Sequence, residues 1–86
     1  MPAPTNAFKA ALRTDDVQVG TWLGFADAYV AEAAATADFD WFLIDGEHAP
    51  NDIPTILSQV AVVQGAGRNA VVRLPIGESW MVKQAL

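Results

Sequence analysis

Three ionisable side chains, Asp45, Glu47 and His48, follow closely on a short apolar run from Trp41 to Ile44. The run predicts a strand that is buried on both faces of a parallel sheet. In α/β proteins, ligands bind at the carboxyl ends of such strands, because the loops there stand clear of the helices. We therefore expect the loop after this strand to carry the chemistry of the chain.

His48 is the only histidine in the sequence, and an imidazole can move a proton near neutral pH. A lone histidine can equally be structural and tie its loop to the backbone by a hydrogen bond. Asp45 favours the chemical interpretation, because its carboxylate can accept from one ring nitrogen and leave the other facing a pocket. These two residues predict an acid–base dyad.

Arg73 lies near the end of a later apolar run, where a charge is costly unless it is paired. Its guanidinium is suited to holding a carboxylate or stabilising an enolate oxygen, and the alternative is a structural salt bridge to Asp45 or Glu47. Glu47 could reach a metal, or be a solvated loop residue. Trp22 could form a pocket wall, or serve only in packing.

Strand and helix signals alternate along the chain. We expect a leading helix from Ala7 to about Thr14, and strands over 17–23, 41–44 and 69–74. A second helix should run from about 27 to 37, with an inward face of Tyr29, Val30, Ala33 and Ala37. A third should begin at a cap, Asn51 or Asp52, with an apolar stripe of Ile53, Ile56, Leu57, Val60 and Val63. A last helix should open at Glu78.

This order predicts an α/β fold made of the N-terminal three β/α units of a (β/α)₈ TIM barrel, incomplete in this chain. Residues 1–16 would be a leading helix, and residues 17–86 the three units. The predicted strands start about 24 to 30 residues apart, close to the spacing of about 31 in a barrel of about 250 residues. The alternative is a flavodoxin-like or other doubly wound sheet, although no glycine-rich phosphate turn follows the first strand.

Composition narrows the class of protein. The 86 residues are 52% hydrophobic and 17% charged, which is typical of a core-rich globular segment and not of a disordered one. The five Lys and Arg residues are scattered and the net charge is −5, so we expect no nucleic-acid partner. The absence of cysteine excludes thiolate metal sites and fits a reducing cytoplasm. With no signal peptide and no apolar run near about 20 residues, we expect a cytoplasmic protein with no membrane partner.

Four segments resemble one known family: G-T-W-L-G at 20–24, F-D-W-F-L-I-D-G-E-H-A-P-N-D at 39–52, V-V-R-L-P at 71–75 and V-K-Q-A-L at 82–86. They are similar to the N-terminal part of the HpcH/HpaI aldolases, the metal-dependent class II pyruvate aldolases. The resemblance covers most of the chain from about Asn6 onward, and its central motif is long and specific.

The resemblance implies a carbon–carbon lyase that uses Mg²⁺, Mn²⁺ or Co²⁺ to join pyruvate or hydroxypyruvate reversibly to an aldehyde. It also implies a (β/α)₈ barrel, usually assembled as a hexamer, so the remainder of the barrel is an expected partner. Carried over by position, it makes His48 with Asp45 the acid–base dyad and Arg73 the group that binds substrate and stabilises the enolate. Trp22 becomes a substrate-facing pocket wall and Glu47 an outer-shell partner of the metal.

In that family the acids that ligate the metal directly lie farther along the barrel than residue 86. We therefore expect residues 1–86 to be inactive on their own. Two alternatives are a non-catalytic barrel fragment or interaction module, in which the acids and His48 only order a loop, and a barrel-type metal hydrolase. Hydrolases usually gather several histidines around their metal, whereas this sequence has one.

Overall fold

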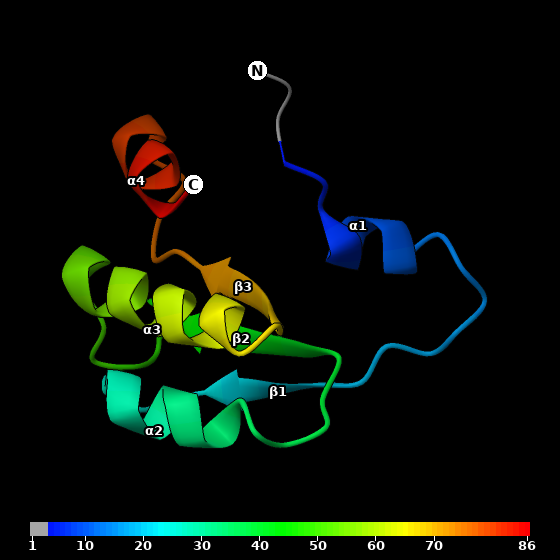
Figure 1. The fold of residues 1–86 in the computed structure, drawn as a ribbon. Coiled ribbons are helices and arrows are strands. Elements are labelled where there is room, and N and C mark those ends of the chain that lie inside the picture. The colour runs from blue at the N-terminus through cyan, green and yellow to red at the C-terminus, as the bar shows by residue number, and fades with distance from the viewer. Residues whose placement is uncertain (1–3) are drawn as a thin grey trace.

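The computed structural model describes residues 4–86. Three parallel strands form one sheet in the order β1-β2-β3, and helices connect them (Figure 1). In chain order the elements are α1 (Ala7–Ala11), β1 (Gly20–Leu23), α2 (Ala28–Ala34), β2 (Trp41–Asp45), α3 (Ile53–Gly65), β3 (Asn69–Arg73) and α4 (Ser79–Ala85). The predicted alternation of strand and helix is confirmed.

The two elements nearest the N-terminus are shorter than predicted. α1 ends at Ala11, and the hydroxyl of Thr14 donates to the carbonyl of Ala11 at 2.7 Å. β1 begins at Gly20: Val17 and Val19 before it are exposed, and the Val19 amide donates to the Asp40 carboxylate at 2.8 Å instead of to a neighbouring strand. Residues 1–3 of the predicted leading segment lie outside the described residues.

One face of the sheet packs against α2 and α3. Side chains alternate between the two faces of a strand, so every second residue of β1, β2 and β3 points to these helices. The buried core on this side consists of Leu23, Phe42 and Ile44 from the sheet and Ala31, Ala35, Ile56 and Val63 from α2, its C-terminal cap and α3. This layer fixes the strands against each other.

The opposite face of the sheet is covered less completely. Trp41 and Leu43 point to it and are only half-buried, and α1 reaches it by packing Phe8 against Trp41 with ring centroids 6.3 Å apart. The predicted burial of the second strand on both faces is therefore wrong within residues 4–86. This face would become the interior of a closed barrel.

The predicted inward face of the second helix is also wrong. The buried positions of this segment are Ala31 and Ala35, whereas Tyr29 is 82% exposed and Val30 lies at the surface. Small alanines allow the helix to pack closely on its neighbours, so the bulky side chains point away. In this alanine-rich helix the apolar spacing did not identify the buried face.

α3 follows its prediction more closely. Asp52 is the N-cap, and its carboxylate accepts from the Thr55 amide while the Thr55 hydroxyl accepts from the Asp52 amide. The Thr55 amide, followed by the Thr55 hydroxyl, lowers the pKa of the Asp52 carboxylate from its ordinary value. Ile56 and Val63 are buried as predicted, but Leu57 is 60% exposed.

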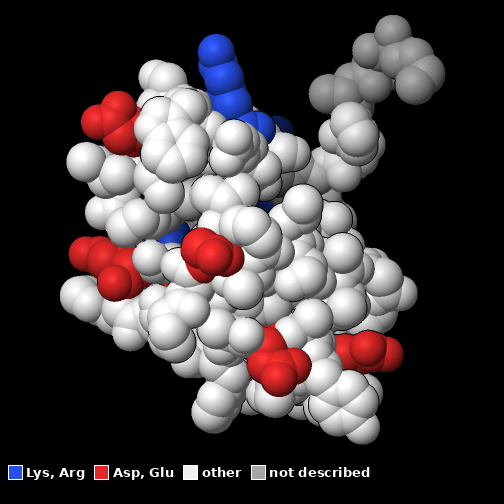
Figure 2. All heavy atoms as spheres, turned by 90° about the vertical axis from the view of Figure 1, so that its left-hand side faces the viewer, with Lys and Arg blue, Asp and Glu red and all other residues white. Residues whose placement is uncertain are grey.

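Much of the surface is uncharged. Figure 2 shows separate acidic groups on an otherwise largely uncharged face. No helix in the described part of the chain has the length and apolar character needed to cross a membrane. Exposed large apolar side chains include Trp22, Phe25, Leu57, Trp80 and Leu86.

We expect residues 1–86 in isolation to unfold without a cooperative transition. The edge of β3 that faces away from β2 is unpaired within the described residues, and apolar side chains lie exposed around it, so partial association or a molten ensemble should result. Differential scanning calorimetry and dye binding would test this. A sharp transition of a monomer would show that these three units are self-sufficient.

Candidate active site

The carboxyl ends of β2 and β3 are joined by a charge pair between Asp45 and Arg73. The sheet register places these residues opposite each other, and strand alternation places Trp22 on the same face of the sheet. Arg73 Nε donates to Asp45 Oδ1 at 3.0 Å, and Nη2 donates to Oδ2. The pairing is therefore bidentate, which fixes the plane of the guanidinium.

The same carboxylate closes the turn that follows β2. Asp45 Oδ1 accepts from the amides of Glu47 at 2.9 Å and His48 at 3.1 Å. The hydrogen bonds from Arg73 hold the pKa of Asp45 far below its ordinary value, and the two amides act in the same direction, whereas burial opposes them. Asp45 also raises the pKa of Arg73. Both groups are therefore charged at neutral pH.

The predicted hydrogen bond between Asp45 and the His48 ring is wrong in this structure. Within residues 4–86, the side-chain oxygens of Asp45 accept from Arg73 and from backbone amides, and the His48 ring is not among the donors. The His48 side chain is 71% exposed, and its Nε2 lies 3.6 Å from Glu47 Oε1. The donors in the turn and on β3 occupy the carboxylate, so the ring extends from the loop toward Glu47.

Glu47 and Trp22 both lie close to the guanidinium of Arg73. Glu47 Oε2 is 3.5 Å from Arg73 Nε, and the Arg73 Cζ lies 5.8 Å from the centroid of the Trp22 ring, a cation–π arrangement. The salt bridges that the sequence allowed for Arg73, to Asp45 and to Glu47, are both present. The structure thus gathers all five predicted site residues, with His48 at the exposed rim.

The described residues do not by themselves fit a divalent cation. No group of three or more His, Asp or Glu side chains within residues 4–86 is arranged to hold a metal ion. The Asp45 carboxylate is already occupied by four hydrogen bonds. That leaves Glu47 as the carboxylate of this site with an accessible oxygen.

Gly46 allows the turn to pass close to the end of β3. Its amide donates to the Arg73 carbonyl at 2.7 Å. A Cβ at this position would lie 2.8 Å from that carbonyl oxygen and 3.0 Å from the Cδ1 of Ile56. A larger residue would therefore push the turn away from Arg73, a constraint that the sequence alone did not reveal.

Asn51 and Gln59 also support the site and were not predicted to do so. Asn51 Nδ2 donates to the Asp45 carbonyl at 2.8 Å, and Gln59 Nε2 donates to Asn51 Oδ1 at 2.7 Å. The sequence predicts Asn51 only as a candidate helix cap. The sequence did contain a signal for Gln59. It lies three residues after Ile56 and four before Val63, so helical spacing places it on the buried side of α3.

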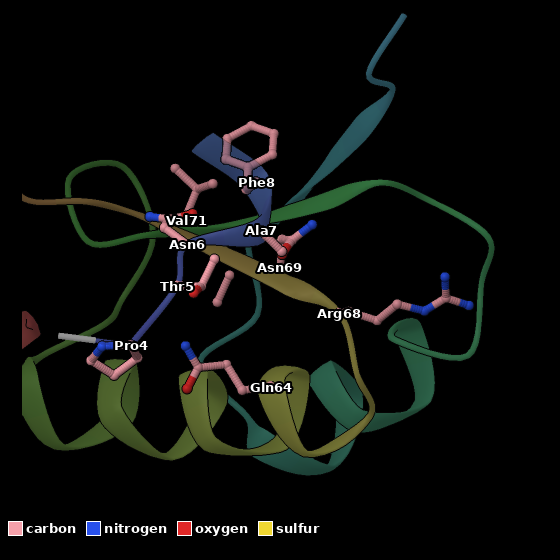
Figure 3. A pocket seen from close by; sticks show the side chains of 10 residues that line it. Pro4, Thr5, Asn6, Ala7, Phe8, Gln64, Arg68, Asn69 and Val71 are labelled. Atoms are coloured by element: carbon pink, nitrogen blue, oxygen red, sulfur yellow. The ribbon is translucent and has the colours of Figure 1, made fainter. Parts of the chain in front are cut away.

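A cavity of about 510 Å³ lies elsewhere, at the amino-terminal end of β3. Residues 4–8 close one side of it, and Gln64 and Arg68 of the α3 end close another (Figure 3). None of the five predicted site residues lines it. It lies along the strand edge that is unpaired within residues 4–86, so we assign it to the edge of the incomplete sheet and not to the site.

The fold and site together define a class: three β/α units of a (β/α)₈ barrel with charged groups at the carboxyl ends of its strands. The chain belongs to the HpcH/HpaI aldolase/citrate lyase family, whose family model matches residues 18–86. It is similar to a solved HpcH/HpaI aldolase/citrate lyase family protein from Burkholderia cenocepacia, with a TM-score of 0.82 and 42% identity. That match covers 94% of this chain and 33% of the other.

Curated relatives agree with this assignment. The chain is 57% identical over 86 residues to a hydroxypyruvate/pyruvate aldolase from Roseovarius nubinhibens, covering all of this chain and 34% of the relative. It is 49% identical over 88 aligned residues to a 4-hydroxy-2-oxovalerate aldolase from Rhodococcus jostii, again covering all of this chain and 34% of the relative. The chain thus spans about a third of the length of these relatives.

Replacing Gly46 by alanine should destabilise the complete barrel, by which we mean these residues continued by the remaining β/α units. The close contacts at Gly46 predict a cost of about 1–3 kcal/mol from overpacking. Gly24→Ala is the matched control: a Cβ there meets nothing within 4 Å, so its effect should stay within about 0.5 kcal/mol. Urea unfolding would measure both, and equal effects would contradict the steric explanation.

Acid should weaken the complete barrel through Asp45. Because its pKa is lower in the folded state than the ordinary value of 3.8, the ionised carboxylate stabilises the fold above that pH, and the contribution is lost as the pH falls below it. Asp45→Asn should lower the unfolding free energy at neutral pH and reduce its decline in acid. Asp38→Asn, at an exposed carboxylate, should keep the wild-type pH dependence in urea unfolding. An unchanged acid slope in Asp45→Asn would count against this assignment.

Proposed function

We propose that this chain supplies the first three β/α units of a metal-dependent class II aldolase. The enzyme would reversibly join a 2-oxo acid, pyruvate or hydroxypyruvate, to an aldehyde. The observation that carries this proposal is the guanidinium of Arg73, fixed by Asp45 at a strand end beside Glu47 and Trp22. Relatives named hydroxypyruvate/pyruvate aldolase support the substrate class.

Arg73 would bind the 2-oxo acid and stabilise the negative charge that develops on its keto oxygen. Asp45 engages Nε and Nη2, whereas Nη1 donates to no protein acceptor within residues 4–86. A guanidinium held on one side can offer its other side to an oxyanion without reorganising during the reaction. The Trp22 ring beside it would limit the space open to the substrate and exclude water.

His48 would move the proton of the aldol hydroxyl. Its ring extends from the loop and is largely exposed in residues 4–86, so a substrate can reach it. In the cleavage direction the ring would accept the hydroxyl proton as the carbon–carbon bond breaks, and in the addition direction it would return it. The Glu47 carboxylate, 3.6 Å from Nε2, lies beside the ring.

A divalent cation, Mg²⁺, Mn²⁺ or Co²⁺, belongs to this proposal, and its Lewis acidity would polarise the 2-oxo acid. Most of its ligands would come from β/α units beyond residue 86, with Glu47 as an outer contact. Assembly of the complete barrel into a hexamer, in the cytoplasm, is also part of the proposal. The rival function is a non-catalytic module in which the same residues only order the loop.

A retro-aldol assay of the complete barrel tests the proposal. We expect cleavage of a 4-hydroxy-2-oxo acid to stop with a chelator and to return with added Mg²⁺ or Mn²⁺. His48→Ala should lower turnover by about 10²-fold or more, as for loss of a positioned acid–base group. Glu32→Gln, at an exposed position on α2, should leave turnover unchanged.

Two results would contradict the proposal. Cleavage that continues undiminished in excess chelator would remove the metal from the reaction. Wild-type turnover in His48→Ala would remove His48 from the chemistry and favour the non-catalytic role of this loop.

A further inference from the structure

A fully buried amide lies behind the site. Gln59, on α3, is 0% exposed among the apolar residues of the core. Its Nε2 donates to Asn51 Oδ1 at 2.7 Å and to the Thr55 carbonyl at 3.0 Å. Within residues 4–86 its Oε1 has no hydrogen-bond partner. A buried polar atom without a partner costs stability, so packing alone does not explain a glutamine here.

Asn51 links this amide to the end of β2 through hydrogen bonds. Its Oδ1 accepts from Gln59 Nε2 and from the Thr55 hydroxyl at 3.0 Å, and its Nδ2 donates to the Asp45 carbonyl at 2.8 Å. Two donors facing Oδ1 determine which end of the Asn51 amide points to the strand. The orientation of Asn51 is therefore set by α3.

The bond from Asn51 to Asp45 closes the base of the site loop. Asp45 is the last residue of β2, and Asn51 directly precedes the Asp52 cap of α3. Glu47 and His48 lie between these two ends. Asp45 is thus held twice: Arg73 binds its side chain, and Asn51 binds its carbonyl.

We propose that Gln59 and Asn51 are positioning residues of the aldol reaction, which orient the loop carrying His48 through the hydrogen bond to the Asp45 carbonyl. This inference rests on the proposed function. Neither residue would touch the substrate. The Asp45–Arg73 pair uses side-chain oxygens that neither residue contacts, so their loss should misplace His48 while leaving the guanidinium that binds the 2-oxo acid in place.

Variants of the complete barrel separate positioning from packing. Gln59→Met keeps the volume and removes the amide, and Gln64→Met is the matched control, an exposed glutamine on the same helix. We expect Gln59→Met to lower kcat for retro-aldol cleavage by about 10-fold or more. KM should change by less than about twofold, because Arg73 still binds the 2-oxo acid. Thermal stability should be equal or higher, because the unpaired Oε1 is removed.

Asn51→Asp tests the individual hydrogen bond. It keeps an oxygen for the Gln59 and Thr55 donors but replaces the nitrogen that donates to the Asp45 carbonyl. We expect Asn51→Asp to lose as much kcat as Asn51→Ala. Rescue of kcat by Asn51→Asp would overturn the proposal, as would full kcat in Gln59→Met, or a loss of kcat in Gln59→Met that is matched by a loss of stability.

Amide hydrogen exchange gives a readout that does not require turnover. The amides of Glu47 and His48 are bonded to Asp45 Oδ1, and both should exchange about 10-fold faster or more in Gln59→Met and Asn51→Ala than in Gln64→Met. Unchanged exchange would overturn the positioning role. An inactive wild-type barrel would instead refute the proposed function, and exchange would still decide whether these residues hold the loop.

Discussion

The carboxylate of Asp45 is the group on which this structure depends. It accepts four hydrogen bonds, two from Arg73 on the neighbouring strand and two from backbone amides of the turn that follows. A carboxylate buried away from water is tolerated only when its charge and its lone pairs are satisfied. Here Arg73 supplies the opposite charge, and Arg73 together with the two turn amides supplies the hydrogen bonds. The Asp45 side chain therefore links the pairing of β2 and β3 to the conformation of the site loop.

The position of this carboxylate follows from the sheet. Parallel register sets the last residue of β2 opposite the last residue of β3, and alternation turns both away from the helices that cover the other face. Trp22 falls on the same face through β1. Three strands are thus sufficient to assemble the arginine, its anchor and an aromatic wall, while the helices fix the strands through a separate apolar layer.

The sequence was most informative where the signal is local. Apolar runs located the strands, and the Asp52 cap and the Ile56 and Val63 positions identified α3. The alternation of strands with helices predicted a parallel sheet, and residues at the ends of its strands, such as Asp45, Arg73 and Trp22, were therefore expected at one edge, where the carboxyl ends of parallel strands meet. These predictions require only neighbours in sequence and the periodicity of a strand or helix.

Other features depended on competition between partners, which spacing does not reveal. Asp45 and His48 are close enough in sequence to pair, but Arg73 and the turn amides occupy the carboxylate first. Similarly, helical spacing predicted an inward face that includes Tyr29, whereas close helix packing selected Ala31 and Ala35. Gln59 was missed because the role of a polar residue within an apolar stripe can be inferred only when its hydrogen-bond partner, here Asn51, is known.

The two carboxylates beside Arg73 contribute differently to the site. Asp45 is 4% exposed and bound on both oxygens, so its pairing with Arg73 is protected from solvent. Glu47 is partly exposed and lies 3.5 Å from the guanidinium, and pairs of that kind contribute little to stability because water and salt screen them. Asp45 therefore determines where the guanidinium stands, whereas Glu47 adds negative charge beside it without fixing it. An anion approaching Arg73 at Nη1 would displace neither carboxylate, because Asp45 binds Nε and Nη2 and Glu47 lies beside Nε, so the anchored geometry can persist while the site is occupied.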